Sequence, residues 1–168
     1  MKRNYLIKTY LLLFVALVWF SGCSDSDSEP TVENTMTRDG VAFKETTVTL
    51  LGVSISGEGH AGVTFTDSNG SLTKVLTVDF EYSPSTSLTG TYSFPETNNH
   101  RLLDDWLTYY AEFSGTSEVT STNLESGTLT LEDLGGSRYA ITIHLTMLDG
   151  TIFQGTYKGP VAAAFNNG

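Results

Sequence analysis

The chain has 168 residues, a formal net charge of -10 and a hydrophobic content of 39%. This hydrophobic content is enough for a folded core, so wholesale disorder is excluded, and the length suits one domain with additional segments. The negative charge excludes a non-specific nucleic-acid binder, because phosphates would be repelled. The single cysteine excludes an internal disulfide framework and a cysteine-rich zinc site.

Residues 1–22 have the composition of a secretory signal peptide. Basic residues precede Tyr10–Phe20, an unbroken apolar run of 11 residues. A helix of that length rises about 16 Å, which is too short to cross a hydrocarbon core of about 30 Å. Ser21-Gly22-Cys23 then resembles the lipobox of bacterial lipoproteins. That resemblance implies cleavage before Cys23 and acylation of this residue, for example with palmitate; an ordinary signal peptide is the alternative.

Residues 23–38 are expected to form a flexible, acidic tether behind the lipidated cysteine. Its beginning, Ser24-Asp25-Ser26-Asp27-Ser28-Glu29-Pro30, cannot bury enough apolar surface to fold. It resembles the acidic stretch of surface-exported lipoproteins of the Bacteroidota, and a plain linker is the alternative. Because Ser24 replaces the aspartate that retains enterobacterial lipoproteins at the inner membrane, we expect a lipid anchor in the outer membrane. Exposure at the cell surface or in the periplasm is left open.

Residues 39–165 are predicted to form a single all-β domain. In Leu72–Tyr82, for example, apolar and polar side chains alternate as in a half-buried strand. Asn69-Gly70, Gly135-Gly136 and Asp149-Gly150 are favourable sequences for hairpin turns. The predicted strands are 41–45, 47–55, 61–67, 72–82, 90–94, about 107–113, 127–133, 137–147 and 151–161.

Eight or nine strands joined mostly by short turns predict an antiparallel meander. A barrel-like architecture is favoured, because closure removes exposed sheet edges, and a two-sheet β-sandwich is the alternative. Residues 102–113 fit a helix as well as a strand. We favour a strand from about Leu107, with Tyr109 and Phe113 inward and with Trp106 and Tyr110 on the opposite face.

The segment after the tether resembles small lipoproteins of the Bacteroidota with a lipocalin-like or β-sandwich domain. The resemblance rests on turn and strand patterns, namely Gly90-Thr91-Tyr92-Ser93-Phe94-Pro95, Ser126-Gly127-Thr128-Leu129-Thr130-Leu131, Asp149-Gly150-Thr151 and Gly155-Thr156-Tyr157-Lys158-Gly159. It implies a protein of the cell envelope.

The sequence carries no recognisable catalytic constellation. Its three histidines have no second histidine or carboxylate at a chelating spacing. Asp104 and Asp105 would point to opposite faces of a strand, whereas glycoside hydrolysis needs two carboxylates across one sugar. The chain also lacks a nucleophile elbow and a phosphate-binding loop. We therefore expect a protein that is not an enzyme and that uses neither a cofactor nor a metal.

Exposed aromatic residues are the best functional candidates. Trp106 and Tyr110 would share an outward face beside Asn99, Arg101 and Asp104. Such side chains stack on sugar rings or anchor a partner, although they also cap the ends of barrels. The sequence thus predicts a lipid-anchored, non-catalytic binding module for a glycan or small ligand. The alternative is a structural or adhesion accessory that contacts other envelope proteins, and the oligomeric state is left open.

Overall fold

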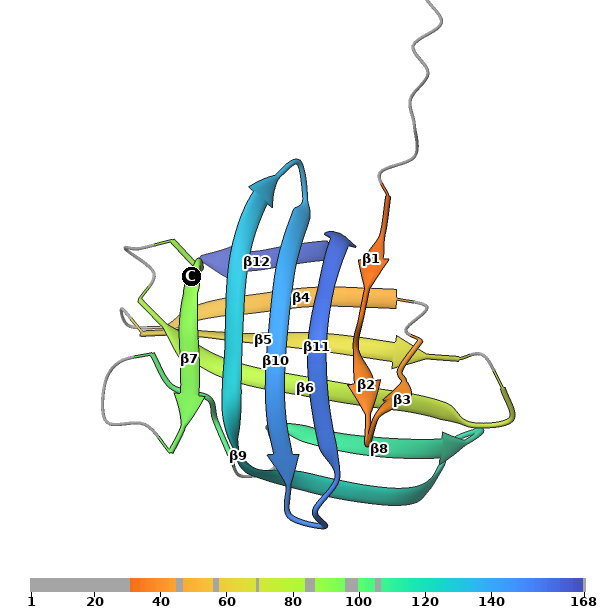
Figure 1. Cartoon of the computed structure of the whole chain (residues 1–168). Helices are drawn as coiled ribbons and strands as arrows, with labels where there is room; N and C mark the ends of the chain where they lie inside the picture. Colours follow the sequence, from red (N-terminus) through yellow and green to blue (C-terminus); the bar gives the residue numbers. More distant parts are fainter. Residues whose placement is uncertain are drawn as a thin grey trace, which may run out of the picture. The chain divides into compact units, whose positions relative to one another are not determined.

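The computed structural model describes residues 31–44, 47–55, 58–68, 70–83, 87–95, 100–104 and 107–167. Strands dominate these segments, and no described residue lies in a helix (Figure 1). The all-β prediction is therefore confirmed. The predicted signal peptide and Cys23 lie outside the described residues.

The described strands belong to one mixed sheet, in the order β12-β4-β5-β6-β8-β9-β10-β11-β2-β3, with β1 paired to β11 and β7 paired to β9. Their bounds are β1 Glu33–Asn34, β2 Thr37–Arg38, β3 Val41–Ala42, β4 Thr47–Ile55, β5 Glu58–Asp67, β6 Thr73–Tyr82, β7 Gly90–Phe94, β8 Tyr109–Ser114, β9 Ser117–Gly135, β10 Arg138–Met147, β11 Ile152–Pro160 and β12 Ala162–Asn167. The pairs β4–β5, β5–β6, β9–β10 and β10–β11 are antiparallel, as a meander requires.

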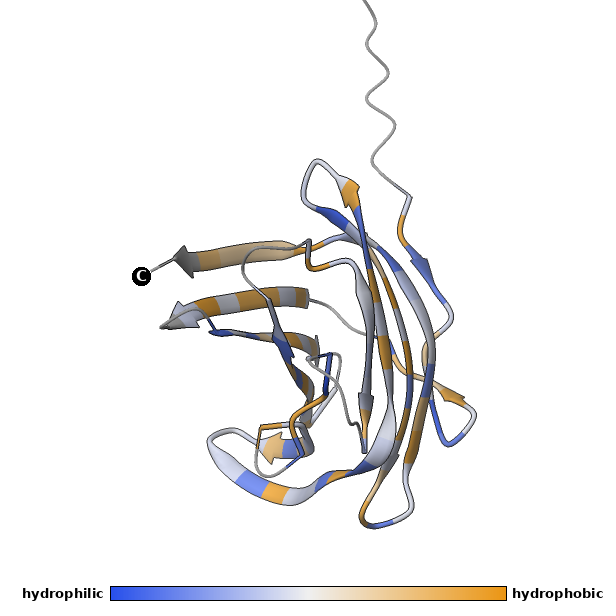
Figure 2. Cartoon of the chain, turned by 90° about the vertical axis from the view of Figure 1, so that its left-hand side faces the viewer, coloured by the Kyte–Doolittle hydropathy of each residue, from blue (hydrophilic) through white to orange (hydrophobic). Residues whose placement is uncertain are grey.

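The long strand β9 folds this sheet into two layers. The first part of β9 pairs with β8, and together with β12, β4, β5 and β6 these strands form the first layer. The second part of β9 pairs with β7 and β10, and together with β11 these strands form the second layer. Figure 1 shows β4, β5, β6 and β8 running across β10 and β11, and Figure 2 shows the two layers from the side. Gly127 lies in β9 with a φ of 155°, where an added Cβ would come within 2.8 Å of the Leu145 Cα atom. Glycine is needed here because the two backbones approach closely.

The sheet is not closed into a barrel. Its ends are β12 and β3, and no pairing between these two strands occurs in the part of the chain that the structure describes. The strand β12 also runs parallel to β4, from which it is far removed in sequence. A mixed sheet with two ends therefore replaces the closed meander that the succession of hairpins had favoured.

Side chains from both layers fill the space between them. The first layer contributes Phe65, Phe80 and Tyr110, which are at most 1% exposed. Their ring centroids lie 6.3 Å from that of Tyr157, 4.4 Å from that of Tyr92 and 5.0 Å from that of Phe153, respectively. Because burial of such a side chain contributes roughly 1.5–3 kcal/mol, this interior holds the layers together.

The folded unit begins earlier than the sequence predicts. It starts at Thr31, so residues 31–38 belong to it rather than to the tether. Met36 is only 2% exposed, and the side chain of Asn34 donates a hydrogen bond to the Phe43 carbonyl oxygen at 3.0 Å. Gly155 (φ 130°) allows this segment to cross β11, because a Cβ there would lie 2.5 Å from the Thr35 oxygen. The prediction of a tether up to residue 38 was wrong for these residues.

Candidate ligand-binding groove

Of the sequence-predicted site residues, the structure describes Arg101, Asp104 and Tyr110, and these three do not share one exposed face. Trp106 and Asn99 lie outside the described residues. Arg101 has a side chain that is 51% exposed and forms an ion pair with Glu81 at 2.6 Å. Asp104 is half-buried in the segment that precedes β8, where its carbonyl oxygen accepts a hydrogen bond from the Thr108 amide at 3.3 Å.

Tyr110 is buried, so the prediction that it faces outward was wrong. It pairs with Leu76 of β6, which is fully buried, and its ring therefore points into the core. The hydroxyl donates to Glu112 Oε1 at 2.7 Å and accepts a hydrogen bond from Arg38 Nη1 at 2.6 Å. The ring is thus in the core, while its polar end is fully engaged.

We call these three residues the Arg38–Tyr110–Glu112 cluster. Arg38 also forms an ion pair with Glu112, and its guanidinium carbon lies 4.4 Å from the centroid of the Tyr110 ring. The hydrogen bonds from Tyr110 and Arg38 lower the pKa of the Glu112 carboxyl. The cluster satisfies its own polar groups, which is the behaviour of a structural contact rather than of a binding site.

The opposite face of β8 lines a groove on the outside of the first layer. Tyr109 pairs with Thr77 of β6 and with Asn123 of β9, so these three side chains form a row across three strands. We call the hollow at this row the outer groove. It has a volume of about 500 Å³ and is lined by Thr77, Asp79, Leu107, Tyr109, Phe113, Glu118, Ser121 and Asn123.

The hollow lies between two aromatic side chains of β8. Tyr109 and Phe113 are both half-buried and are four residues apart, or about 13 Å along an extended strand. Alternation places Ala111 between them on the same face, and its small side chain is fully covered. This face of β8 therefore presents two half-buried aromatic side chains that both line the outer groove.

Asp79 is held at one end of the outer groove by its backbone. The pairing of β6 with β8 ends at Thr77. Beyond Thr77, residues of the segment before β8 form hydrogen bonds to the backbone of β6. The Asp79 amide donates to Thr108 Oγ1 at 2.9 Å, and the Asp79 carbonyl oxygen accepts from the Leu103 amide at 2.9 Å. Since Thr108 is itself fully buried, the position of Asp79 is fixed by the fold.

The carboxylate of Asp79 belongs to none of the ion pairs among the described residues. Burial raises its pKa to about 6, against the opposing effects of the hydrogen bond from the Phe80 amide and of the charge of His60. Two residues further along β6, Glu81 accepts two hydrogen bonds from Arg101, and these lower the pKa of Glu81. Asp79 thus keeps acceptor capacity that Glu81 has already used.

A second hollow adjoins the outer groove across β6, and we call it the adjoining hollow. It has a volume of about 330 Å³ and is lined by Leu51, Gly52, Val53, His60, Ala61, Gly62, Thr64, Thr77 and Asp79. The two hollows share Thr77 and Asp79. They therefore form one continuous depression on the outside of the first layer.

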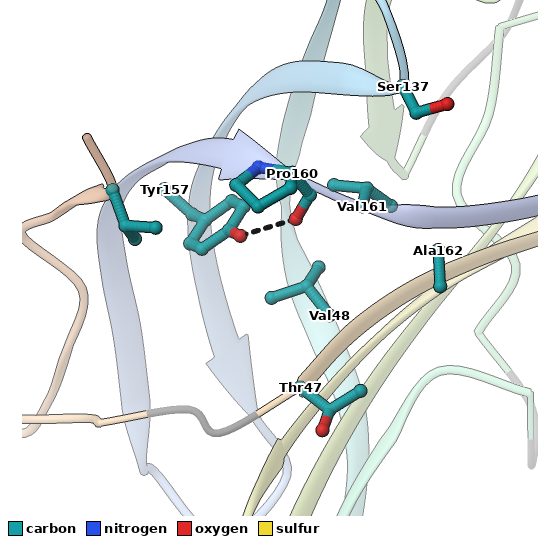
Figure 3. A pocket seen from close by; sticks show the side chains of 8 residues that line it. Thr47, Val48, Ser137, Tyr157, Pro160, Val161 and Ala162 are labelled. Carbon is teal, nitrogen blue, oxygen red and sulfur yellow. Dashed lines mark hydrogen bonds between the residues drawn. The ribbon is translucent and has the colours of Figure 1, made fainter. Parts of the chain in front are cut away.

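A third hollow lies where β11 passes into β12 (Figure 3). It has a volume of about 490 Å³ and is lined by Val32, Thr47, Val48, Ser137, Tyr157, Pro160, Val161 and Ala162. The Tyr157 hydroxyl points to the Pro160 carbonyl oxygen and donates to it at 2.6 Å. Its lining is mostly apolar and contains no side-chain carboxylate, carboxamide or imidazole. It therefore offers fewer groups that could orient a ligand than the outer groove does.

Sequence reasoning missed Asp79, Tyr109, Phe113 and Asn123 as site residues. The available signal was the polar side of Leu72–Tyr82, on which Asp79 lies. Within the described residues, no group of three or more histidine, cysteine, aspartate or glutamate side chains is placed to hold a metal ion. The same residues contain no helix long and apolar enough to span a membrane.

Comparisons with protein-family models, with curated proteins and with solved structures find no match to this chain.

Proposed function

We propose that the chain is a lipid-anchored envelope protein whose outer groove binds a glycan without catalysing a reaction. The observation that carries this proposal is the combination of Tyr109 and Phe113 with Asp79 and Asn123 along one groove. The apolar faces of sugar rings pack on aromatic side chains, and sugar hydroxyls bond to carboxylates and carboxamides. The groove provides both kinds of contact on rigid strands.

The positions of the two carboxylates favour binding over hydrolysis. Glu118 pairs with Phe113, which in turn lies opposite Thr73 of β6. Asp79 is six residues further along β6, so the two carboxylates are about 20 Å apart along the strand direction. Glycosidases place their pair within roughly 10 Å. This separation therefore favours recognition of a glycan over its hydrolysis by these two carboxylates.

A titration of the delipidated full mature chain with neutral oligosaccharides tests the glycan proposal. Tyr109→Ala should weaken binding about fivefold, because stacking on one aromatic ring contributes on the order of 1 kcal/mol. Val119→Ala serves as the matched control, since Val119 is 58% exposed on β9 and does not line the groove. Undiminished binding by the double variant Tyr109→Ala/Asp79→Asn would overturn the proposal.

The anchor of the proposed protein is Cys23, with attachment to the outer membrane. The lipobox-like Ser21-Gly22-Cys23 and the acidic stretch behind it support this assignment. Cys23→Ala should abolish incorporation of labelled palmitate and leave the signal peptide uncleaved by signal peptidase II. Unchanged labelling would contradict it. Proteolysis of intact cells then distinguishes a domain exposed at the cell surface from one that faces the periplasm.

A structural or adhesion accessory is the second candidate, and one feature favours it. The strand β12 ends the sheet and, among the described strands, pairs only with β4. Its sequence, Ala162–Asn167, carries no charged residue, although charges are a common protection of edge strands. Ala164→Lys should then reduce cross-linking to other envelope proteins while glycan binding is kept. Equal cross-linking by wild type and variant would eliminate this candidate.

A further inference from the structure

The two hollows on the outside of the first layer together define the shape of a ligand. They meet at Thr77 and Asp79 of β6 and extend from β4 on one side to β9 on the other. The strands β4, β5, β6, β8 and β9 are successive neighbours in the sheet. Four strand spacings of about 4.8 Å make this depression about 19 Å wide across the strands. A single sugar ring would occupy only part of it.

The charges that line the depression select against acidic ligands. Asp79 and Glu118 line the outer groove, and neither hollow is lined by a lysine or an arginine. His60 lines the adjoining hollow, and its charge lowers the pKa of Asp79, while burial has the larger and opposite effect. A uronate or a sulfated sugar would meet the repulsion of these carboxylates without a lysine or arginine in the lining to offset it. A neutral ligand does not meet this repulsion.

The floor of the adjoining hollow is shaped to leave Asp79 accessible. Gly62 lies opposite Asp79 in the register of β5 and β6, and a Cβ on Gly62 would lie 3.4 Å from Asp79 Oδ2. Next to it, the hydroxyls of Thr64 and Thr77 are 3.2 Å apart. One of these hydroxyls donates to the other, so the second keeps its hydrogen for a ligand. A donor and an acceptor thus lie side by side between the two hollows.

We propose that the ligand is a neutral, unbranched oligosaccharide that occupies both hollows, with Asp79 accepting its hydroxyl groups where it crosses β6. This inference rests on the proposed function, because it assigns the chain length and charge of the glycan bound at the same site. The sugar unit in the outer groove stacks on Tyr109. The next units lie over Gly62 and against Leu51 and Val53, which are 58% and 38% exposed.

The experiment is a calorimetric titration of the full mature protein with defined oligosaccharides. The probes are gluco-, xylo- and manno-oligosaccharides of two to six units and, as the acidic counterpart, oligogalacturonates of the same lengths. In the neutral series that binds, affinity should rise at least tenfold between the disaccharide and the longest member. The oligogalacturonates should bind at least tenfold more weakly than the neutral oligosaccharides of equal length.

Two variants separate this inference from the proposed function. Leu51→Ala/Val53→Ala should reduce binding of the hexasaccharide to that of the disaccharide, while disaccharide binding stays unchanged. Tyr109→Ala should weaken both. Affinity that does not grow with chain length, equal losses for short and long ligands, or equal binding of oligogalacturonates would overturn the inference and leave the glycan site in place. Failure of every saccharide to bind would overturn both.

Discussion

The two faces of β8 carry similar side chains and differ in how those side chains are paired. The inward face has Tyr110 and Glu112, which Arg38 joins in one cluster. The outward face has Tyr109 and Phe113 beside Asp79, whose carboxylate has no basic partner among the described ion pairs. Aromatic and acidic residues therefore do not identify a binding site by themselves. The presence or absence of an internal cation decides whether they stabilise the fold or stay available.

The pKa shifts express the same contrast with opposite signs. Hydrogen bonds lower the pKa of Glu112, so its contribution to stability is complete above its ordinary pKa and is lost as pH falls through the lowered value. Burial raises the pKa of Asp79 from 3.8 to about 6. The folded protein therefore loses stability at Asp79 as pH rises through this interval. Residues that lower stability are often kept because function requires them. Ligand binding by the Asp79 carboxylate would explain this cost.

The largest effect is expected from truncation of the inward tyrosine. Tyr110→Ala should lower the free energy of unfolding by about 3–5 kcal/mol, because it leaves a cavity beside Phe153 and removes the central member of the cluster. Tyr109→Ala, on the same strand, should cost less than about 1 kcal/mol. Urea unfolding of both variants measures the difference. Equal losses of stability would show that the two faces are not functionally distinct.

Removal of the cation should have the next largest effect. Arg38→Ala should lower the free energy of unfolding by about 2 kcal/mol, because it leaves Glu112 partly buried and with Tyr110 as its remaining hydrogen-bond partner among the described contacts. Arg138→Ala is the control, since Arg138 donates to the Thr31 carbonyl oxygen at 3.3 Å without a carboxylate partner in the described ion pairs. A loss for Arg38→Ala that does not exceed the control would contradict a structural role for the cluster.

Asp79→Asn should stabilise the protein, and only above the ordinary pKa of aspartate. At pH 8 we expect a gain of about 1–2 kcal/mol, allowing for the partial solvent screening of this group. At pH 3.5 wild type and variant should be nearly equal, because Asp79 is then largely protonated in both the folded and the unfolded chain. Thermal unfolding at the two pH values measures this. Destabilisation by the substitution at pH 8 would mean that the carboxylate is needed by the fold.

The smallest effect is expected for the ion pair whose arginine is exposed, that of Arg101 with Glu81. Arg101→Ala should change the free energy of unfolding by about 0.5 kcal/mol, since the Arg101 side chain is 51% exposed and surface ion pairs contribute little. This change should vanish in 1 M salt. A loss as large as that of Arg38→Ala would show that the stabilisation by an ion pair does not depend on how deeply the pair is buried.

Most strands were predictable from the chain because alternation and hairpin sequences mark them locally. The strands β1 and β2 have two residues each, which is too short for any periodicity. The first part of β9 is rich in serine, threonine and glutamate and is exposed, so only its pairing with β8 makes it a strand. The strand β12 depends on pairing with β4, more than a hundred residues away in sequence. Long-range pairing of this kind leaves no local signal.

The candidate site was less predictable than the fold, and β8 shows why. Tyr109, Tyr110 and Phe113 place aromatic residues on both faces, so alternation does not say which face is buried. A shift by one residue exchanges the faces completely. The decision comes from Arg38, 72 residues away, and from Phe153 in the other layer. Likewise, the polar position of Asp79 was visible, but its absence from the described ion pairs is a property of the folded chain.

The division of β9 between the two layers has a consequence for unfolding. Neither layer is a continuous piece of chain: β9 contributes to both, β7 is inserted between β6 and β8, and β12 returns from the second layer to the first. One layer cannot separate without breaking strands of the other. The described domain should therefore melt in a single cooperative transition, with equal calorimetric and van't Hoff enthalpies. A protease cut in β9 should accordingly destabilise both layers together.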